Sequence, residues 1–119
     1  MPSAIIVEDE VLAAERLRVL LEECGVVLLK TFHHAQHALD WLSVHEVDIV
    51  FSDINMPEIT GLEFVERIKR LAKKQPHVIF TTAYEEFALR AFELAAADYL
   101  LKPIKIARLQ TALVRIQES

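Results

Sequence analysis

Short apolar runs alternate with segments of helical spacing along the whole chain. Five of these runs are rich in β-branched residues and are too short to form helices, so they predict strands. The runs are AIIV at 4–7, VVLL at 26–29, DIVFS at 48–52, HVIFT at 77–81 and DYLL at 98–101. Because several carry apolar residues at successive positions, we expect strands that are buried on both faces.

The segments between the runs place apolar residues three and four positions apart, which predicts amphipathic helices. The predicted faces are Ala13, Leu17, Leu20, Leu21 and Cys24; Ala35, Ala38, Leu39 and Leu42; Leu62, Val65, Ile68 and Ala72; Phe87, Ala88, Ala91, Phe92 and Ala95; and Ile106, Leu109, Leu113 and Ile116. Gly25 is the predicted C-cap of the first helix. Five repeats of strand and helix predict a doubly wound α/β fold, with helices on both faces of a parallel sheet.

Length and composition narrow the class of protein further. A chain of 119 residues is the usual size of one compact domain, so we expect residues 1–119 to form a single domain. The net charge of −5 disfavours broad attraction to nucleic acid or anionic membrane. There is no apolar run of the ~18 residues that a membrane helix needs, and Cys24 is the only cysteine. We therefore expect a cytoplasmic protein with no membrane segment.

Polar residues with related chemistry follow the predicted strands. Glu8 and Asp9 come after the first run, Asp53 after the third, Thr82 after the fourth and Lys102 after the fifth. Ligands of such folds bind at the carboxyl ends of the strands, where these side chains would meet. Clustered carboxylates suit a hard divalent cation, Mg²⁺ above all. A lysine and a hydroxyl suit a phosphoryl group, and a carboxylate such as Asp53 can be its acceptor.

Taken together and in order, these motifs resemble response-regulator receiver domains over essentially the whole chain. The resemblance rests on the acidic pair Glu8-Asp9, on DINMPEITG at 53–61, on TTA at 81–83 and on YLLKPI at 99–104. It implies a flavodoxin-like (βα)5 fold whose five parallel strands have the order 2-1-3-4-5. It also implies a signalling module that catalyses only its own phosphoryl transfer and dephosphorylation, and no enzyme for other substrates.

The resemblance implies a role for each acid. Asp53 would take a phosphoryl group from the phosphohistidine of a sensor histidine kinase. Asp9 and Asp53 would ligate Mg²⁺ directly, together with the backbone carbonyl of Asn55, and Glu8 would act through a water molecule. Glu8 stands where the family usually has aspartate, and its longer arm suits the water-mediated role.

The same resemblance implies a two-state switch. Thr82 would donate to a phosphoryl oxygen, and Lys102 would pair with Asp53 or its phosphate. Tyr99 would move inward as Thr82 shifts, and the peptide bond between Lys102 and Pro103 would be cis. The fourth helix, fifth strand and fifth helix would form the readout surface, which is also the surface of a possible homodimer.

A narrower resemblance concerns residues 83–104, AYEEFALRAFELAAADYLLKPI, which look like receivers of LytTR-type transcription regulators. Their DNA-binding domain would follow the fifth helix and lies outside this chain. DNA contact would therefore come only through that output domain. The alternative is a stand-alone receiver that acts by protein–protein binding.

Plainer interpretations exist for single residues. Asp53 alone could cap a turn, Lys102 alone could be a solvated surface lysine, and Thr82 and Tyr99 could be packing residues. A cluster of histidines, His33, His34 and His37, comes from one short segment without cysteine, and we assign it to a solvated loop and helix start.

Two other functions fit the same residues less well. A small-molecule phosphatase with an aspartyl-phosphate intermediate would have a second acid two residues after Asp53, where Asn55 stands, and it would usually have a cap insertion. A receiver-shaped scaffold that is never phosphorylated would have lost the acids or the lysine, and none is lost here.

Overall fold

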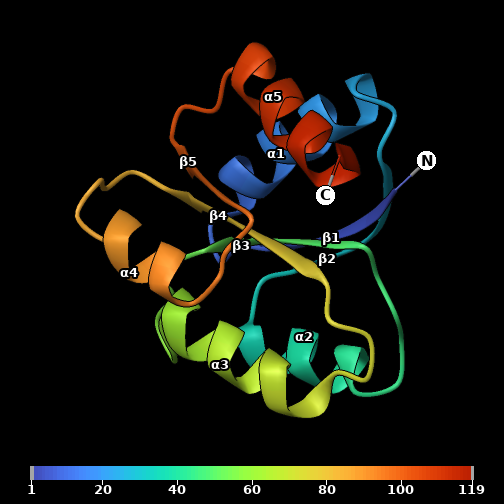
Figure 1. Cartoon of the computed structure of the whole chain (residues 1–119), viewed down its shortest axis with the longest axis vertical. Helices are drawn as coiled ribbons and strands as arrows, with labels where there is room; N and C mark the ends of the chain where they lie inside the picture. The colour runs from blue at the N-terminus through green and yellow to red at the C-terminus, as the bar shows by residue number, and fades with distance from the viewer. Residues whose placement is uncertain (1, 119) are drawn as a thin grey trace.

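The computed structural model describes residues 2–118 and contains a five-stranded parallel sheet with helices on both faces (Figure 1). The strands are β1 (Ser3–Val7), β2 (Val27–Phe32), β3 (Ile49–Asp53), β4 (His77–Thr82) and β5 (Asp98–Leu101). The helices are α1 (Val11–Glu23), α2 (Ala35–Leu42), α3 (Gly61–Leu71), α4 (Ala88–Glu93) and α5 (Ile106–Glu118). The strand order is β2-β1-β3-β4-β5, which confirms the predicted topology. Within residues 2–118, no helix is long and apolar enough to span a bilayer.

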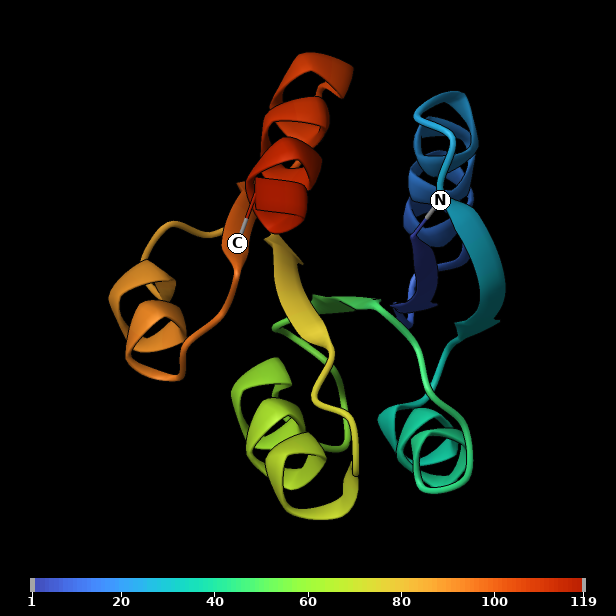
Figure 2. The ribbon, with the colours of Figure 1, turned by 45° about the vertical axis from the view of Figure 1, so that its right-hand side comes forward.

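Two hydrophobic cores form because the central strands are apolar on both faces. In β1, Ala4 and Ile6 pack into the core beneath α1 and α5, whereas Ile5 and Val7 pack into the core beneath α2, α3 and α4. Figure 2 shows the two helical layers on opposite sides of the sheet, with α4 beside β5. Burial on both faces holds the central strands firmly, and their carboxyl ends share that rigidity.

The helix ends follow from local sequence. After α1, Gly25 adopts a φ of 77°, and the N–H of Val26 donates to the carbonyl oxygen of Leu21 at 3.0 Å. The C-cap residue is Cys24, and Gly25, which the sequence predicts as the C-cap, takes the left-handed position directly after it. At the start of α3, the hydroxyl of Thr60 accepts from the N–H of Glu63 at 3.1 Å, as an N-cap does.

Three strands, β1, β3 and β4, start or end within one residue of their predicted runs, whereas β2 and α4 differ more from the prediction. The second strand was predicted at 26–29 but runs from Val27 to Phe32, because an exposed edge strand accepts polar residues such as Lys30 that end the apolar run. The fourth helix is shorter than its predicted face, since it ends at Glu93 and Ala95 has a φ of 60°. Phe92 belongs to that face in the prediction, yet its side chain is 58% exposed.

Candidate functional site

The site is built around Asp53, the last residue of β3 at the centre of the sheet. In the parallel register Val7 of β1 lies beside Ser52 of β3. The residues that come next along the chain, Glu8 and Asp53, therefore lie at the same edge of the sheet. Asp53 is 7% exposed and Glu8 is 3% exposed. Two carboxylates are thus held in a largely dry environment, where each needs a partner.

Asp9 completes an acidic cluster with Glu8 and Asp53. One carboxylate oxygen from each of the three residues lies within 4.8 Å of the others, and Asp9 is exposed while the other two are buried. The cluster therefore has an open side toward solvent. A set of oxygen ligands with an open side suits a hard divalent cation that keeps part of its water shell.

Lys102 supplies the positive charge of this edge. Its backbone N–H donates to the carbonyl oxygen of Thr82 at 2.7 Å, which extends the pairing of β4 with β5 by one residue. Its ammonium group donates to Oε1 of Glu8 and to Oδ2 of Asp53, the latter at 3.3 Å. One lysine thus forms hydrogen bonds with two buried carboxylates, which lie at the ends of two different strands.

The charge balance of the cluster is negative. Burial raises the pKa of Glu8 to about 7, although the hydrogen bond from Lys102 opposes this rise, and nearby Asp53 adds to it. Burial lowers the pKa of Lys102, but the hydrogen bond to Glu8 and the charge of Asp53 outweigh burial and leave that pKa raised. The lysine therefore stays charged, and a single ammonium does not neutralise three acids.

Gly61 fixes the loop that follows Asp53. Its N–H donates to the carbonyl oxygen of Ile54 at 2.7 Å. A Cβ atom at this position would lie 2.4 Å from the carbonyl oxygen of Asp53, closer than any side chain tolerates. The glycine that closes the MPEITG stretch is the only sign of this contact in the sequence. Within the loop, the N–H of Asn55 donates to Oδ1 of Asp53 at 3.3 Å.

Thr82 and Tyr99 converge on the backbone of Tyr84. Thr82 is fully buried, and its hydroxyl oxygen accepts from the N–H of Tyr84 at 3.2 Å. The hydroxyl of Tyr99, a residue that is 8% exposed, donates to the carbonyl oxygen of Tyr84. Thr82 and Tyr99 are predicted site residues, whereas Tyr84 joins them through main-chain atoms and carries no sequence signal for that role.

The remaining predicted residues lie around this edge. The peptide bond between Lys102 and Pro103 is cis. His33 lies beside the cluster, with Nδ1 at 2.9 Å from the backbone carbonyl oxygen of Glu8, which can only accept a hydrogen bond. The rings of His34 and His37 contact each other instead, with centroids 5.1 Å apart.

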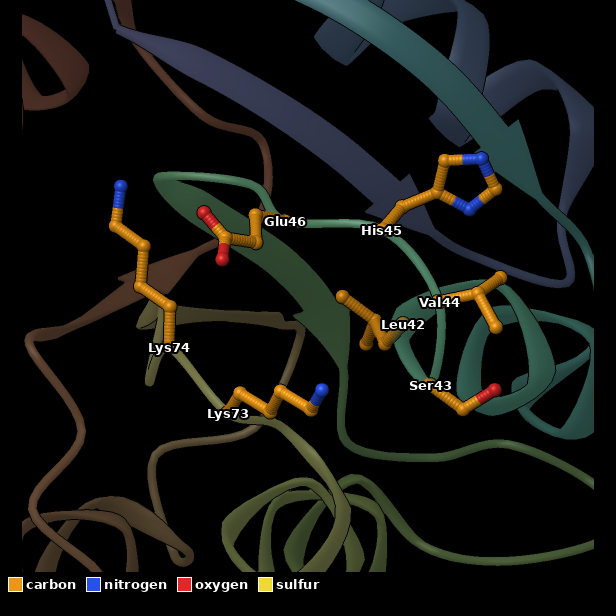
Figure 3. Close-up of a pocket in the computed structure, with 7 residues that line it drawn as sticks. All are labelled: Leu42, Ser43, Val44, His45, Glu46, Lys73 and Lys74. Carbon is orange, nitrogen blue, oxygen red and sulfur yellow. The ribbon is translucent and has the colours of Figure 1, made fainter.

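A separate pocket lies near the amino ends of the strands. It is lined by residues 42–46, which precede β3, and by Lys73 and Lys74, which precede β4 (Figure 3). Lys74 is paired with Asp48 at 3.2 Å. This pocket contains none of the residues of the acidic cluster, so the candidate site remains the carboxyl edge of the sheet.

Comparison with known protein families identifies the family of the domain that carries this site. The family described as "Response regulator receiver domain" matches residues 4–114. The chain belongs to this family. The predicted resemblance is therefore confirmed. Among solved structures, the response regulatory domain of MrkE from Klebsiella pneumoniae has a TM-score of 0.88 and 35% identity, over 98% of this chain and 95% of that one. The CheY-like receiver domain from Methylobacillus flagellatus has a TM-score of 0.89 and 33% identity, over 98% of each chain.

Curated relatives of this receiver domain are longer regulators. The sensory transduction protein LytR of Staphylococcus haemolyticus is 38% identical over 95% of this chain and 44% of its own length. The transcriptional regulatory protein BtsR of Escherichia coli is 40% identical over 99% of this chain and 49% of its own length. The chain thus spans about half the length of the curated relatives it matches.

Proposed function

We propose that this receiver domain accepts a phosphoryl group on Asp53. A carboxylate oxygen of Asp53 forms a bond to phosphorus while the phosphorus–nitrogen bond of a donor phosphohistidine breaks. The histidine nitrogen leaves with the electron pair of that bond. The observation that carries this proposal is the position of Asp53, which ends the central strand, belongs to the acidic cluster and contacts Lys102.

Mg²⁺ is the proposed cofactor. The carboxylates of Asp9 and Asp53 and the backbone carbonyl of Asn55 would ligate the ion, and Glu8 would contact it through water. When bound, the ion supplies positive charge to the phosphoryl oxygens. The donor set fits this role, because it consists of hard oxygen atoms with an open side, and because the cluster carries more negative charge than Lys102 balances.

Lys102 and Thr82 are the proposed phosphoryl-binding side chains. The ammonium group of Lys102 already contacts Asp53, so it would neutralise a phosphoryl oxygen there with a small movement. The hydroxyl of Thr82 would turn from Tyr84 to donate to another oxygen. The carbonyl oxygen of Tyr84 also accepts a hydrogen bond from Tyr99. Loss of the contact between Thr82 and Tyr84 would therefore change the surroundings of Tyr99, the proposed second member of the switch.

Incubation of the chain with Mg²⁺ and acetyl phosphate tests the phosphoacceptor. We expect one acyl phosphate per molecule, detected as a single mass increment that hydroxylamine removes. Asp53→Ala should abolish the increment, whereas Asp40→Ala, which removes an exposed acid on α2, should leave it intact.

Two outcomes would contradict the proposal. An increment that persists in Asp53→Ala would assign the acceptor to another residue. Multiple turnover on many phosphomonoesters would favour a small-molecule phosphatase over a signalling domain.

The proposed partner in phosphoryl transfer is a sensor histidine kinase. We further propose that residues 1–119 form one receiver domain of a LytTR-type transcription regulator, and that DNA contact comes through its output domain. The likeness to LytR and BtsR supports this proposal. Reading the gene beyond codon 119 tests it: a basic DNA-binding segment is expected, and an immediate stop codon would favour a stand-alone receiver.

A homodimer is the proposed result of phosphorylation. Its surface would consist of α4, β5 and α5, where Leu89 is 74% exposed, Phe92 is 58% exposed and Leu101 is 42% exposed. Large exposed apolar side chains on neighbouring elements are typical of contact surfaces. Light scattering with and without beryllium fluoride, a phosphoryl mimic, should show a doubled mass only with the mimic, and Phe92→Glu should prevent it. An unchanged mass would overturn the proposal.

A further inference from the structure

We propose that Glu8 positions Lys102 for the phosphoryl group, in addition to its proposed water-mediated contact with the metal. This inference rests on the proposed function, because it assumes that Lys102 meets a phosphoryl group on Asp53. It gives Glu8 a role through another side chain, and that role depends on the length of the glutamate arm.

The Glu8 side chain is held at both oxygens. It is 3% exposed, Oε1 accepts from the ammonium group of Lys102, and Oε2 accepts from the N–H of Glu10 at 3.3 Å. Its backbone is fixed as well, since its N–H donates to Phe32 at 2.9 Å and its carbonyl oxygen contacts His33. A carboxylate anchored in this way presents one oxygen to Lys102 in a constant direction.

Lys102 needs such a partner. A lysine side chain has four rotatable bonds, so ordering it costs rotamer freedom unless a partner holds it in place. Asp53 is the more distant of its two acidic partners, at 3.3 Å, while Glu8 is the nearer. Glu8 therefore orders the ammonium group beside Asp53 before the phosphoryl group arrives, which is the preorganisation that a phosphoryl site requires.

The length of the Glu8 side chain distinguishes the positioning of Lys102 from a contact with the metal. Aspartate is one methylene shorter and draws the carboxylate back by about 1.5 Å, the length of one carbon–carbon bond. That distance is enough to break the contact with Lys102, whereas an intervening water molecule can adjust to it. Glutamine keeps the length and an accepting oxygen but loses the charge.

Three variants of the chain test the inference without phosphoryl transfer. In metal-free protein labelled with ¹³C at lysine Cε, relaxation measurements report the order of the Lys102 side chain, assigned with Lys102→Arg. We expect Glu8→Asp to lower that order to the level of exposed Lys105, and Glu8→Gln to retain most of it. Glu46→Asp, the same shortening in the loop of the distant pocket (Figure 3), should change nothing. An unchanged Lys102 signal in Glu8→Asp would overturn the inference.

Two further measurements separate positioning from the metal role. Calorimetric titration should give Glu8→Asp a Mg²⁺ dissociation constant within about threefold of the wild type. At saturating Mg²⁺, the maximal rate of acyl phosphate formation from acetyl phosphate should fall about fivefold, with the half-saturating donor concentration unchanged. A full loss of Mg²⁺ binding with normal Lys102 order would overturn the positioning role. Wild-type protein that forms no acyl phosphate would instead overturn the proposed function.

Discussion

Two buried acidic sites of this domain, one around Asp98 and one around Asp53, have opposite charge balances. Asp98 begins β5 and is 3% exposed. Its carboxylate accepts two hydrogen bonds from Arg108, at 2.6 and 3.1 Å, a longer one from Arg115 at 3.5 Å, and one from the N–H of Tyr99 at 2.8 Å. One acid thus faces two arginines on α5.

The acidic cluster has three acids for one lysine. Burial raises the pKa of Glu8 to about 7, and the neighbouring Asp53 adds to that rise. At Asp98, burial alone would raise the pKa, but the hydrogen bonds from Arg108 and Tyr99 outweigh burial and lower it. The comparison indicates that a buried acid with surplus positive partners is structural, whereas buried acids with too few positive partners are candidates for a cation site.

Removal of one acid from each site should have the largest effect, with opposite signs. Asp98→Ala leaves Arg108 and a buried N–H without their acceptor, so we expect the free energy of unfolding to fall by about 2 kcal/mol. Asp53→Ala relieves repulsion, so the free energy of unfolding should hold or rise by up to about 1 kcal/mol. Urea denaturation in EDTA near neutral pH measures both. Equal losses in the two variants would contradict the comparison.

The two sites should also respond to pH in different windows. Between its ordinary pKa of 4.5 and the folded value of about 7, Glu8 binds a proton more tightly in the folded state than in the unfolded state. The free energy of unfolding should therefore fall across that window as the pH rises, by about 1 to 3 kcal/mol. The stabilisation from Asp98 is present above its ordinary pKa of 3.8 and is lost as the pH falls below it.

Urea midpoints recorded across these windows check the pH prediction. Glu8→Gln should abolish the fall in metal-free protein, whereas Asp98→Asn should keep it. A wild-type midpoint that rises steadily through the window above the ordinary pKa of Glu8 would refute the assignment.

Magnesium should stabilise the folded state through the acidic cluster and not through the site at Asp98, and this effect should be smaller than the two above. A ligand at ten times its dissociation constant stabilises the folded state by about 1.4 kcal/mol. Thermal unfolding should show this gain in the wild type and in Asp98→Asn, and the gain should disappear in Asp9→Ala, which removes a proposed ligand. Equal gains in Asp9→Ala and in the wild type would mean that the ion stabilises the fold from another place.

The smallest expected effect concerns the outer arginine at Asp98. Arg115 is 63% exposed at its side chain and lies 3.5 Å from Asp98, so Arg115→Ala should change the free energy of unfolding by less than about 0.5 kcal/mol. Arg108→Ala removes the two shorter bonds and should cost more, about 1 to 2 kcal/mol. If urea denaturation shows the same loss in the free energy of unfolding for both variants, Arg115 stabilises the fold more than its geometry indicates.

The sequence predicted the sheet well because its central strands obey one strong rule, burial on both faces. It predicted the edge elements less well. The extent of β2 depends on solvent exposure at Lys30, and the end of α4 depends on the left-handed turn at Ala95, which a run of alanines does not signal.

Part of the candidate site was also accessible from sequence. The residue types at the strand ends indicated the cluster, because parallel strands bring their carboxyl ends to one edge. The contact between Glu8 and Lys102 was missed, since it depends on how far two long side chains reach across the sheet. The role of Tyr84 was missed because it uses backbone atoms alone.

The contact of Gly61 with the backbone of Asp53 has a consequence for how this domain can vary. Residues 55–60 form a loop whose two ends are joined, since Gly61 bonds to Ile54 and leaves no room for a side chain. In that loop Glu58 is exposed and can change, whereas Met56 and Ile59 pack against the core and Thr60 caps α3. An insertion or deletion would displace either Asp53 or the start of α3. Exposed positions of this loop can therefore vary by substitution, but the length of the loop is fixed by the contact of Gly61 with Ile54 and Asp53.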